Sequence, residues 1–100
     1  MQQSLNVGDL AGIYSALGDA SRLGIVIYLL KKEANVSQIA SHVNLSQPLV
    51  SHHLRLLKDL RILKSSKKGQ CVYYSLNDDH IKEIVEIGML HIAHGGSDVH

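Results

Sequence analysis

Apolar side chains recur every three or four positions along four stretches of this 100-residue chain, and this spacing predicts amphipathic helices. The predicted helices cover residues 7–17, 20 to about 32, 36 to about 43 and 47 to about 61. Asp19, Asn35 and Ser46 stand where the N-caps of the last three helices are expected, because their short side chains can accept backbone N–H groups. Pro48 falls in the first turn of the fourth helix, where its missing N–H has no cost.

The periodicity changes after Ile62 from helical to alternating. Residues 63–66 and 71–76 predict two strands around a turn at residues 67–70. A last helix is predicted from about Asp78 to His94, where Gly95 and Gly96 would end it. The order α-α-α-α-β-β-α predicts a mainly α fold with a small β-hairpin, of the winged helix-turn-helix class.

Length and composition restrict the class of protein further. A chain of 100 residues buries a limited core and often completes it by dimerising. A hydrophobic content of 45% with one proline excludes a disordered chain. No apolar run reaches the roughly 18 residues of a membrane span, and residues 1–9 lack the basic and apolar regions of a signal peptide. The single cysteine, Cys71, excludes an intrachain disulfide, so we expect a cytoplasmic protein.

Charge is segregated along the chain, although the net charge is only +1. Residues 1–45 are neutral, residues 46–76 carry a net charge of +5, and residues 77–100 carry a net charge of −4. Four of the seven histidines lie in that acidic last quarter, at His80, His91, His94 and His100. A basic middle predicts contact with a polyanion, whereas an acidic, histidine-rich end predicts contact with cations.

A short helix, a brief turn and a second helix that begins with small polar side chains are typical of a helix-turn-helix that binds double-stranded DNA. On the second of these helices, Val50, Leu54, Leu57 and Leu60 are spaced to face the core, which leaves polar side chains outward. The hairpin would form a wing that lays two lysines along the phosphate backbone. The predicted DNA contacts are Ser46, Gln47, Ser51, His52, Arg55, Lys67 and Lys68. His53 is expected to pack rather than to contact bases.

Two pairs of potential metal ligands flank the predicted last helix. Asp78 and His80 stand at its start, where the backbone of the cap is still extended, whereas His91 and His94 are three positions apart and share one face. The spacing from His80 to His91 corresponds to about 16 Å of helix rise, so one ion cannot join both pairs within a chain. Two such helices packed antiparallel across a two-fold axis would place each pair beside the other pair of the partner chain.

Three imidazoles and one carboxylate form a closed tetrahedral ligand set that suits zinc, with cobalt as the second choice and nickel less favoured. A closed set leaves no position for a substrate water. We therefore expect a regulatory or structural site in a protein that is not an enzyme and has no small-molecule substrate. We also expect a homodimer that is joined through its terminal helices and does not bind a membrane. We expect a single domain over residues 1–100, with the helix-turn-helix at about 36–61, the wing at about 63–76 and the dimerisation and metal-binding helix at about 78–94.

Taken together, these residues resemble the ArsR/SmtB family of metal-responsive repressors over nearly the whole chain. The resemblance rests on Ala16-Leu17-Gly18-Asp19 with Arg22-Leu23, Asn44-Leu45-Ser46-Gln47 with Val50-Ser51-His52, Leu54 and Leu57-Lys58, Gly69-Gln70 with Tyr74-Ser75-Leu76, and Asp78-x-His80 followed after ten residues by His91-x-x-His94. It implies a homodimer that binds an operator without metal and releases it when zinc or cobalt binds, so that metal efflux or sequestration genes are expressed. The second metal site of the family needs cysteines in the stretch equivalent to residues 33–39, which has none here. Pro48-Leu49 departs from the family pattern at the start of the fourth helix.

Three other functions remain open at this point. A winged-helix repressor could respond to oxidation of Cys71, although a lone cysteine on a strand is more often a small core residue. A zinc hydrolase would need a His-Glu-x-x-His helix or a nucleophile motif, and the sequence has neither. A metal-stabilised protein-interaction module would share the ligand pattern but would not bind DNA.

Overall fold

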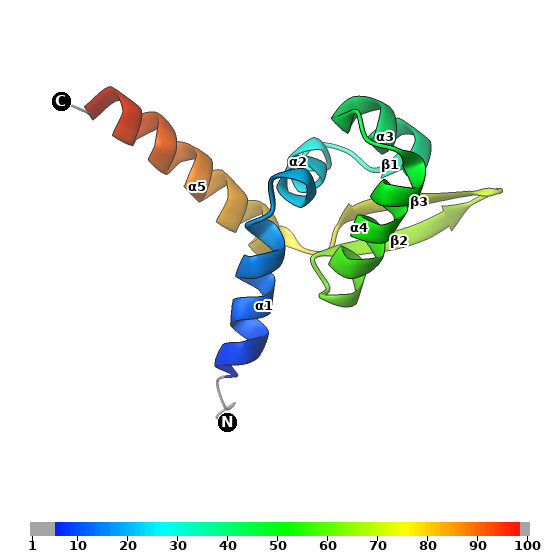
Figure 1. Cartoon of the computed structure of the whole chain (residues 1–100), viewed down its shortest axis with the longest axis horizontal. Helices are drawn as coiled ribbons and strands as arrows, with labels where there is room; N and C mark the ends of the chain where they lie inside the picture. Colours follow the sequence, from blue (N-terminus) through cyan, green and yellow to red (C-terminus); the bar gives the residue numbers. More distant parts are fainter. Residues whose placement is uncertain (1–5, 99–100) are drawn as a thin grey trace.

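The computed structural model describes residues 6–98, which form five helices and a small antiparallel sheet (Figure 1). In chain order the elements are α1 (Val7–Leu17), α2 (Ala20–Tyr28), β1 (Ala34–Asn35), α3 (Val36–Val43), α4 (Gln47–Asp59), β2 (Leu63–Lys68), β3 (Cys71–Leu76) and α5 (Asp79–Asp98). This order confirms the predicted winged helix-turn-helix class, with one strand more than the sequence pattern indicated. The β2–β3 hairpin, which we call the wing, points away from α5 (Figure 1).

Side-chain caps fix the starts of three helices at the positions that the sequence predicted. The carboxylate of Asp19 accepts the backbone N–H of Arg22 at 3.0 Å, and the Ser46 hydroxyl caps α4 in the same way. Asn35 and Gln38 form a capping box at the start of α3, in which each side chain accepts the backbone N–H of the other residue. Each such cap contributes about 1 kcal/mol to stability.

The second helix, α2, ends at Tyr28, about one turn earlier than predicted. The N–H of Leu29 bonds to the carbonyls three and four residues earlier, both at 3.1 Å, and this tightens the last turn. Leu29 is itself buried, and the chain then extends toward β1. Lys31 and Lys32 therefore lie in the connection rather than in the helix.

The end of α4 is a tight turn at Arg61, and the helix stops two residues before its predicted end. Arg61 adopts a left-handed conformation with φ 60°. The N–H groups of Arg61 and Ile62 bond to the carbonyls of Lys58 and Leu57, each at 2.9 Å, which is the pattern of a Schellman motif. Ile62 and Leu57 both belong to the buried core, so apolar packing supports the same turn.

The sheet has the order β1-β3-β2, with β3 in the centre. β2 and β3 pair antiparallel up to Lys68 opposite Cys71, so the predicted turn at residues 67–70 shrinks to Gly69 and Gln70. Gly69 has φ 64°, a conformation that residues with a Cβ rarely adopt. β1 was absent from the predicted order because two residues are too few to show an alternating pattern.

The last helix, α5, continues through Gly95 and Gly96 to Asp98, so the predicted stop at the glycine pair is wrong. Glycine weakens a helix by about 1 kcal/mol but ends it only where the backbone turns to the left-handed conformation. The helix starts as expected, because the carboxylate of Asp78 accepts the backbone N–H of Ile81 at 3.2 Å. His100 lies outside the described residues.

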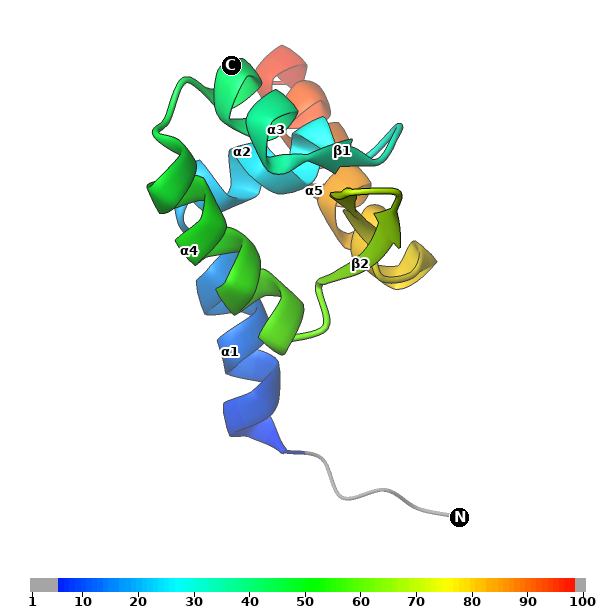
Figure 2. The ribbon, with the colours of Figure 1, turned by 90° about the vertical axis from the view of Figure 1, so that its right-hand side faces the viewer.

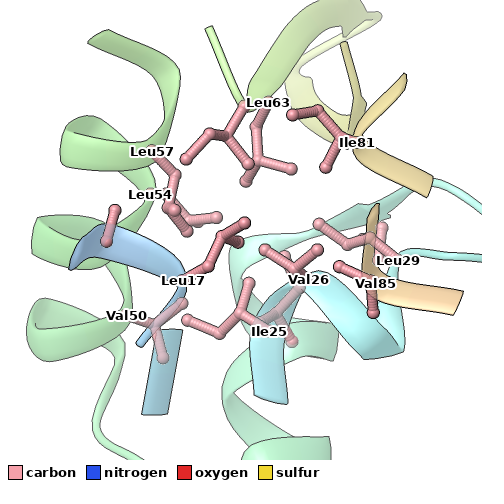
Figure 3. Packing of buried hydrophobic residues seen from close by; sticks show 14 of the residues in the cluster. Leu17, Ile25, Val26, Leu29, Val50, Leu54, Leu57, Leu63, Ile81 and Val85 are labelled. Atoms are coloured by element: carbon pink, nitrogen blue, oxygen red, sulfur yellow. The ribbon is translucent and has the colours of Figure 1, made fainter. Parts of the chain in front are cut away.

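The buried core joins α2, α3, α4 and β2, and the first turns of α5 pack onto it (Figure 3). Its largest fully buried side chains are Ile25, Ile39, Leu54, Leu57, Ile62, Leu63, Val26 and Val50. Leu17 of α1 and Ile81 and Val85 of α5 complete the cluster. Each large side chain gains about 1.5–3 kcal/mol by leaving water, so this cluster fixes the mutual positions of the helices.

Beyond the core, α1 and α5 extend in different directions from the body of the protein (Figures 1 and 2). Large apolar side chains are exposed on both helices, at Val7, Leu10, Tyr14, Ile87, Met89, Leu90 and Ile92. No single helix among residues 6–98 is long and apolar enough to cross a membrane, and α1 and α2 meet that criterion only as a pair bent by 82°. Most of the large apolar side chains that are exposed in the described residues therefore lie on the two terminal helices.

Replacing Arg61 by glycine should stabilise the fold, because glycine adopts the left-handed conformation without the steric cost of a Cβ. Arg61→Ala removes the same charge but keeps the Cβ, and it isolates the backbone effect. In urea unfolding we expect R61G to exceed R61A by about 1 kcal/mol in the free energy of unfolding. Equal stability of the two variants would show that the turn at residue 61 is not under backbone strain.

Candidate nucleic-acid interface and metal half-sites

The α4 helix turns one face into the core and the opposite face to solvent. Val50, Leu54 and Leu57 are completely buried, as their spacing predicted, and Leu60 is half-buried. The outward side chains are Gln47, His52 and Arg55, which are exposed, and Ser51, which is half-buried. The Ser46 hydroxyl is engaged with the backbone at the start of the helix. A helix that presents short polar side chains along an exposed face is suited to the major groove of DNA.

His53 is buried on the inner side of α4, as the sequence predicted. Its exposed fraction is 8%, and its Nδ1 atom has no hydrogen-bond partner. Burial and the nearby Arg22 guanidinium lower the pKa of His53, and the Asp19 carboxylate offsets only part of this effect. Arg22 also donates from Nε to the carbonyl of Ala16 at 3.0 Å. The end of α1, the start of α2 and the middle of α4 therefore meet at one polar cluster.

The wing places both of its predicted DNA contacts near its tip. Lys67 and Lys68 are exposed there at the end of β2. The ammonium group of Lys68 pairs with the Glu33 carboxylate and lies 5.6 Å from the centre of the Tyr73 ring. The pair of Glu33 and Lys68 leaves no signal in the sequence, because the two residues are 35 positions apart and each looks like an ordinary surface charge.

Cys71 is exposed at the start of β3, opposite Lys68. The expectation of a small core residue is therefore wrong. The reason is the position of the strand, because β3 begins outside the core and its side chains become half-buried only from Tyr73 onward.

Asp78 and His80 lie close together at the start of α5, and we call them the first half-site. The Nδ1 atom of His80 is 3.6 Å from a carboxylate oxygen of Asp78, and both side chains are exposed. The Asn77 side chain donates to Asp78 at 3.2 Å, and this bond and the Ile81 backbone N–H lower the pKa of Asp78. Asp78 is therefore a carboxylate at neutral pH, and its oxygens retain lone pairs that can bind a cation.

His91 and His94 lie on the distal part of α5, and we call them the second half-site. Both side chains are exposed, and their spacing places them on one face of the helix. The helix is continuous between the half-sites, which are therefore about 16 Å apart along its axis. No three potential metal ligands come together within residues 6–98 of one chain. The donor chemistry fits zinc only if the half-sites of two chains combine.

The start of α5 is tied to the end of α4 by a main-chain hydrogen bond. The N–H of Asn77 donates to the carbonyl of Ile62 at 3.0 Å, and Ile62 closes the turn after α4. The side chain of the same asparagine contacts Asp78 of the first half-site. The sequence did not reveal this link, because a main-chain hydrogen bond leaves no pattern in the side chains.

Comparison with known proteins decides the family. Residues 19–65 match the profile of the family described as "Bacterial regulatory protein, arsR family". A cadmium resistance transcriptional regulatory protein CadC homolog of Staphylococcus aureus is 45% identical over 87 residues, which cover 86% of this chain and 72% of the relative. The chain belongs to the arsR family.

Two further proteins are similar to this chain. The transcriptional repressor SmtB homolog of Synechocystis sp. is 39% identical over 75 residues, which cover 75% of this chain and 57% of the relative. The crystal structure of NolR from Sinorhizobium fredii has a TM-score of 0.77 at 31% identity, covering 94% of this chain and 98% of NolR. The family is one of regulatory proteins, and the CadC and SmtB homologs are a transcriptional regulator and a transcriptional repressor, which confirms the predicted non-enzymatic function. The roles of the individual DNA-facing and metal-ligating residues stay predictions.

His53 should make the stability of this arsR-family protein fall in mildly acidic solution. Its pKa in the folded chain lies below the ordinary value of about 6.5 that it regains on unfolding, so the unfolded chain binds the extra proton first. Stability is therefore full above about pH 6.5 and decreases as the pH falls toward the folded pKa. Urea unfolding at about pH 7.5 and about pH 5.5 should show a smaller loss for His53→Leu than for the wild type.

His52→Gln, at the exposed neighbouring position, is the matched control and should keep most of the pH dependence of the wild type, because the His52 imidazole is the smallest of the causes that lower the pKa of His53. An identical pH dependence in His53→Leu and the wild type would show that burial of His53 does not couple folding to protonation.

Proposed function

We propose that this arsR-family chain is a metal-sensing transcriptional repressor that acts as a homodimer in the cytoplasm. The dimer binds double-stranded operator DNA through α4 and the wing, and it releases the operator when zinc or cobalt binds, so that metal efflux or sequestration genes are expressed. In this proposal residues 1–100 act as one winged helix-turn-helix domain. The observation that supports it most strongly is that one continuous helix holds two complementary half-sites apart.

The uncovered apolar surface of the terminal helices supports the homodimer. Tyr14 of α1 and Met89 and Ile92 of α5 line a groove together with Leu23 and Ile27 of α2. Monomeric proteins rarely expose a large apolar surface of this kind. A second copy of the chain would cover it with the same surface, as a two-fold axis requires.

The exposed polar and basic side chains of α4 and the wing support operator binding. The proposed contacts are Ser46, Gln47, Ser51, His52, Arg55, Lys67 and Lys68. The amide, hydroxyl and imidazole groups at the start of α4 can hydrogen-bond base edges, and the arginine and lysines can contact phosphates. The net charge of +5 on residues 46–76 would supply the sequence-independent part of the affinity.

The chemistry of the half-sites supports zinc as the signal, with cobalt as an alternative and nickel less favoured. When bound, zinc would join Asp78 and His80 of one chain to His91 and His94 of the partner chain and so hold the two α5 helices together. The chain itself supplies an ionised carboxylate and exposed imidazoles on a helix that is already formed.

A short segment of the chain connects the first half-site to α4. Asn77 precedes Asp78 and is hydrogen-bonded to Ile62, which closes the α4 turn. Successive major grooves of DNA lie about 34 Å apart, so the separation of the two α4 helices in a dimer decides how well both can bind. A separation that mismatches the grooves lowers operator affinity.

A response to oxidation of Cys71 is the second candidate function, because the thiol is exposed on the wing. The metal half-sites would then have only a structural role. In this case a thiol reagent would release the operator, whereas zinc would have no effect.

Zinc should weaken operator binding by about 5- to 150-fold, the range of typical coupling between two binding sites. The measurement is a titration of a labelled promoter fragment with protein, with and without zinc. His80→Gln removes a ligand of the first half-site and should bind DNA as the metal-free wild type does in both conditions. Unchanged affinity of the wild type with zinc would exclude the switch and leave a structural metal site.

Two variants that each lack one half-site should restore zinc binding when they are mixed. The first variant combines Asp78→Asn with His80→Gln, and the second combines His91→Gln with His94→Gln. Neither homodimer contains a complete site, but a mixed dimer contains one site with all four ligands intact. After random exchange of chains we expect about a quarter of the zinc bound by the wild type, since half of the dimers are mixed.

Equilibrium dialysis with zinc measures this content, and the unmixed variants serve as controls. A mixture that binds no more zinc than the two variants bind separately would show that each site forms within one chain or that the chain is a monomer.

A further inference from the structure

Lys68, next to the tip of the wing, is held by groups from two other parts of the chain. Its ammonium group pairs with the carboxylate of Glu33 in the connection between α2 and β1, and it lies 5.6 Å from the centre of the Tyr73 ring. β1 follows Glu33 directly and pairs with β3, with Asn35 opposite Tyr73. The sheet therefore brings the acid, the ring and the lysine together.

The neighbouring Lys67 differs from Lys68 in this respect. Successive side chains of a strand point to opposite faces, so the two lysines leave β2 in different directions. In the part of the chain that the structure describes, Lys67 forms no ion pair. Near its tip, the wing thus presents one lysine, Lys68, that is paired within the described part of the protein and one, Lys67, that is not.

We propose that Glu33 competes with DNA phosphate for Lys68. In the unbound protein Glu33 holds the Lys68 ammonium group, and on DNA binding a phosphate takes the place of the carboxylate. Glu33 thereby lowers the affinity for DNA without contacting DNA. This inference rests on the proposed function, because it requires the wing to lie against the phosphate backbone.

The exposure of the pair makes the exchange feasible. The side chains of Lys68 and Glu33 are 57% and 38% exposed, and an ion pair in such a position changes an equilibrium constant by about fivefold at most. A phosphate of DNA lies in a strong negative potential and can displace one carboxylate.

The salt dependence of binding distinguishes an exchanged lysine from an unpaired one. Each phosphate that a lysine neutralises releases condensed counterions and makes the slope of log K against log salt more negative by about 0.9. When Lys68 leaves Glu33, the carboxylate attracts a cation from solution, which cancels part of that release. Lys68 of the wild type therefore adds less to the slope than an unpaired lysine does.

The test measures binding of the wild type, E33Q, K68Q and the double variant to a duplex that the wild-type protein selects from a random-sequence pool. We expect E33Q to bind about two- to fivefold more tightly per wing at about 0.1 M salt. Its salt slope should be steeper than that of the wild type by up to about 0.9 per wing. In the K68Q background the same E33Q change should have little effect on affinity or slope.

Asp59→Asn is the matched control, because Asp59 is the only acidic residue in the basic segment 46–76 and it is exposed. Its effect on affinity acts through charge alone and should be equal in the presence and absence of K68Q. If E33Q raised the DNA affinity equally in the wild type and in K68Q, Glu33 would act only by repelling DNA, as Asp59 does. This result would overturn the proposed competition for Lys68.

Weaker binding by E33Q would also overturn the proposal, because Glu33 would then support the wing instead of competing with DNA. If E33Q left the DNA affinity and its salt slope unchanged, Lys68 would not contact a DNA phosphate, and the proposal would be overturned. If the wild type selects no duplex, the proposed function itself fails and the inference fails with it. If the wild type and the control bind normally and only E33Q departs from expectation, the inference alone fails.

Discussion

Burial of the inner face of α4 is the constraint on which the rest of the structure depends. Val50, Leu54 and Leu57 are inaccessible to solvent, and truncating Leu54 or Leu57 to alanine would cost about 2–5 kcal/mol. Because that face is fixed, the direction of the opposite, polar face is fixed as well. The turn closed by Ile62 then sets the start of the wing and, through its bond from Asn77, the start of α5. The proposed DNA-facing surface and the first candidate half-site thus take their positions from one packed helix face.

Two features of the single chain favour the proposed dimer. Its terminal helices expose apolar side chains that a core of this size does not cover, and its two half-sites lie on one helix at a distance that no ion spans. A second chain related by a two-fold axis would supply both the missing surface and the missing ligands. Because α5 carries both exposed apolar side chains and the two half-sites, dimerisation and metal binding would reinforce one another.

Local signals in the sequence predicted the helix starts, whereas ends and long-range pairs depended on tertiary structure. Asp19, Asn35 and Ser46 cap their helices at the predicted positions, because a cap is a contact between residues three apart. The early end of α2 follows from the need to reach β1, which pairs with a strand about 40 residues further on. The continuation of α5 through Gly95 contradicts a glycine signal that holds only where the backbone turns.

For the predicted site residues too, the sequence revealed local spacing but not contacts that depend on tertiary structure. Spacing along α5 predicted two half-sites, and the continuous helix supports their predicted separation, because a helix converts residue number directly into distance. Spacing could not show that Lys68 is paired with Glu33 or that Asn77 joins the first half-site to Ile62, since both contacts form only in the folded chain.

These two contacts, Lys68 with Glu33 and Asn77 with Ile62, lie at different ends of the sheet, and they would act on DNA binding in different ways. The Asn77 link would change the separation of the α4 helices, whereas the Glu33 pair would change the charge available on the wing. Since they share no residue, their effects on operator affinity would add as independent free energies.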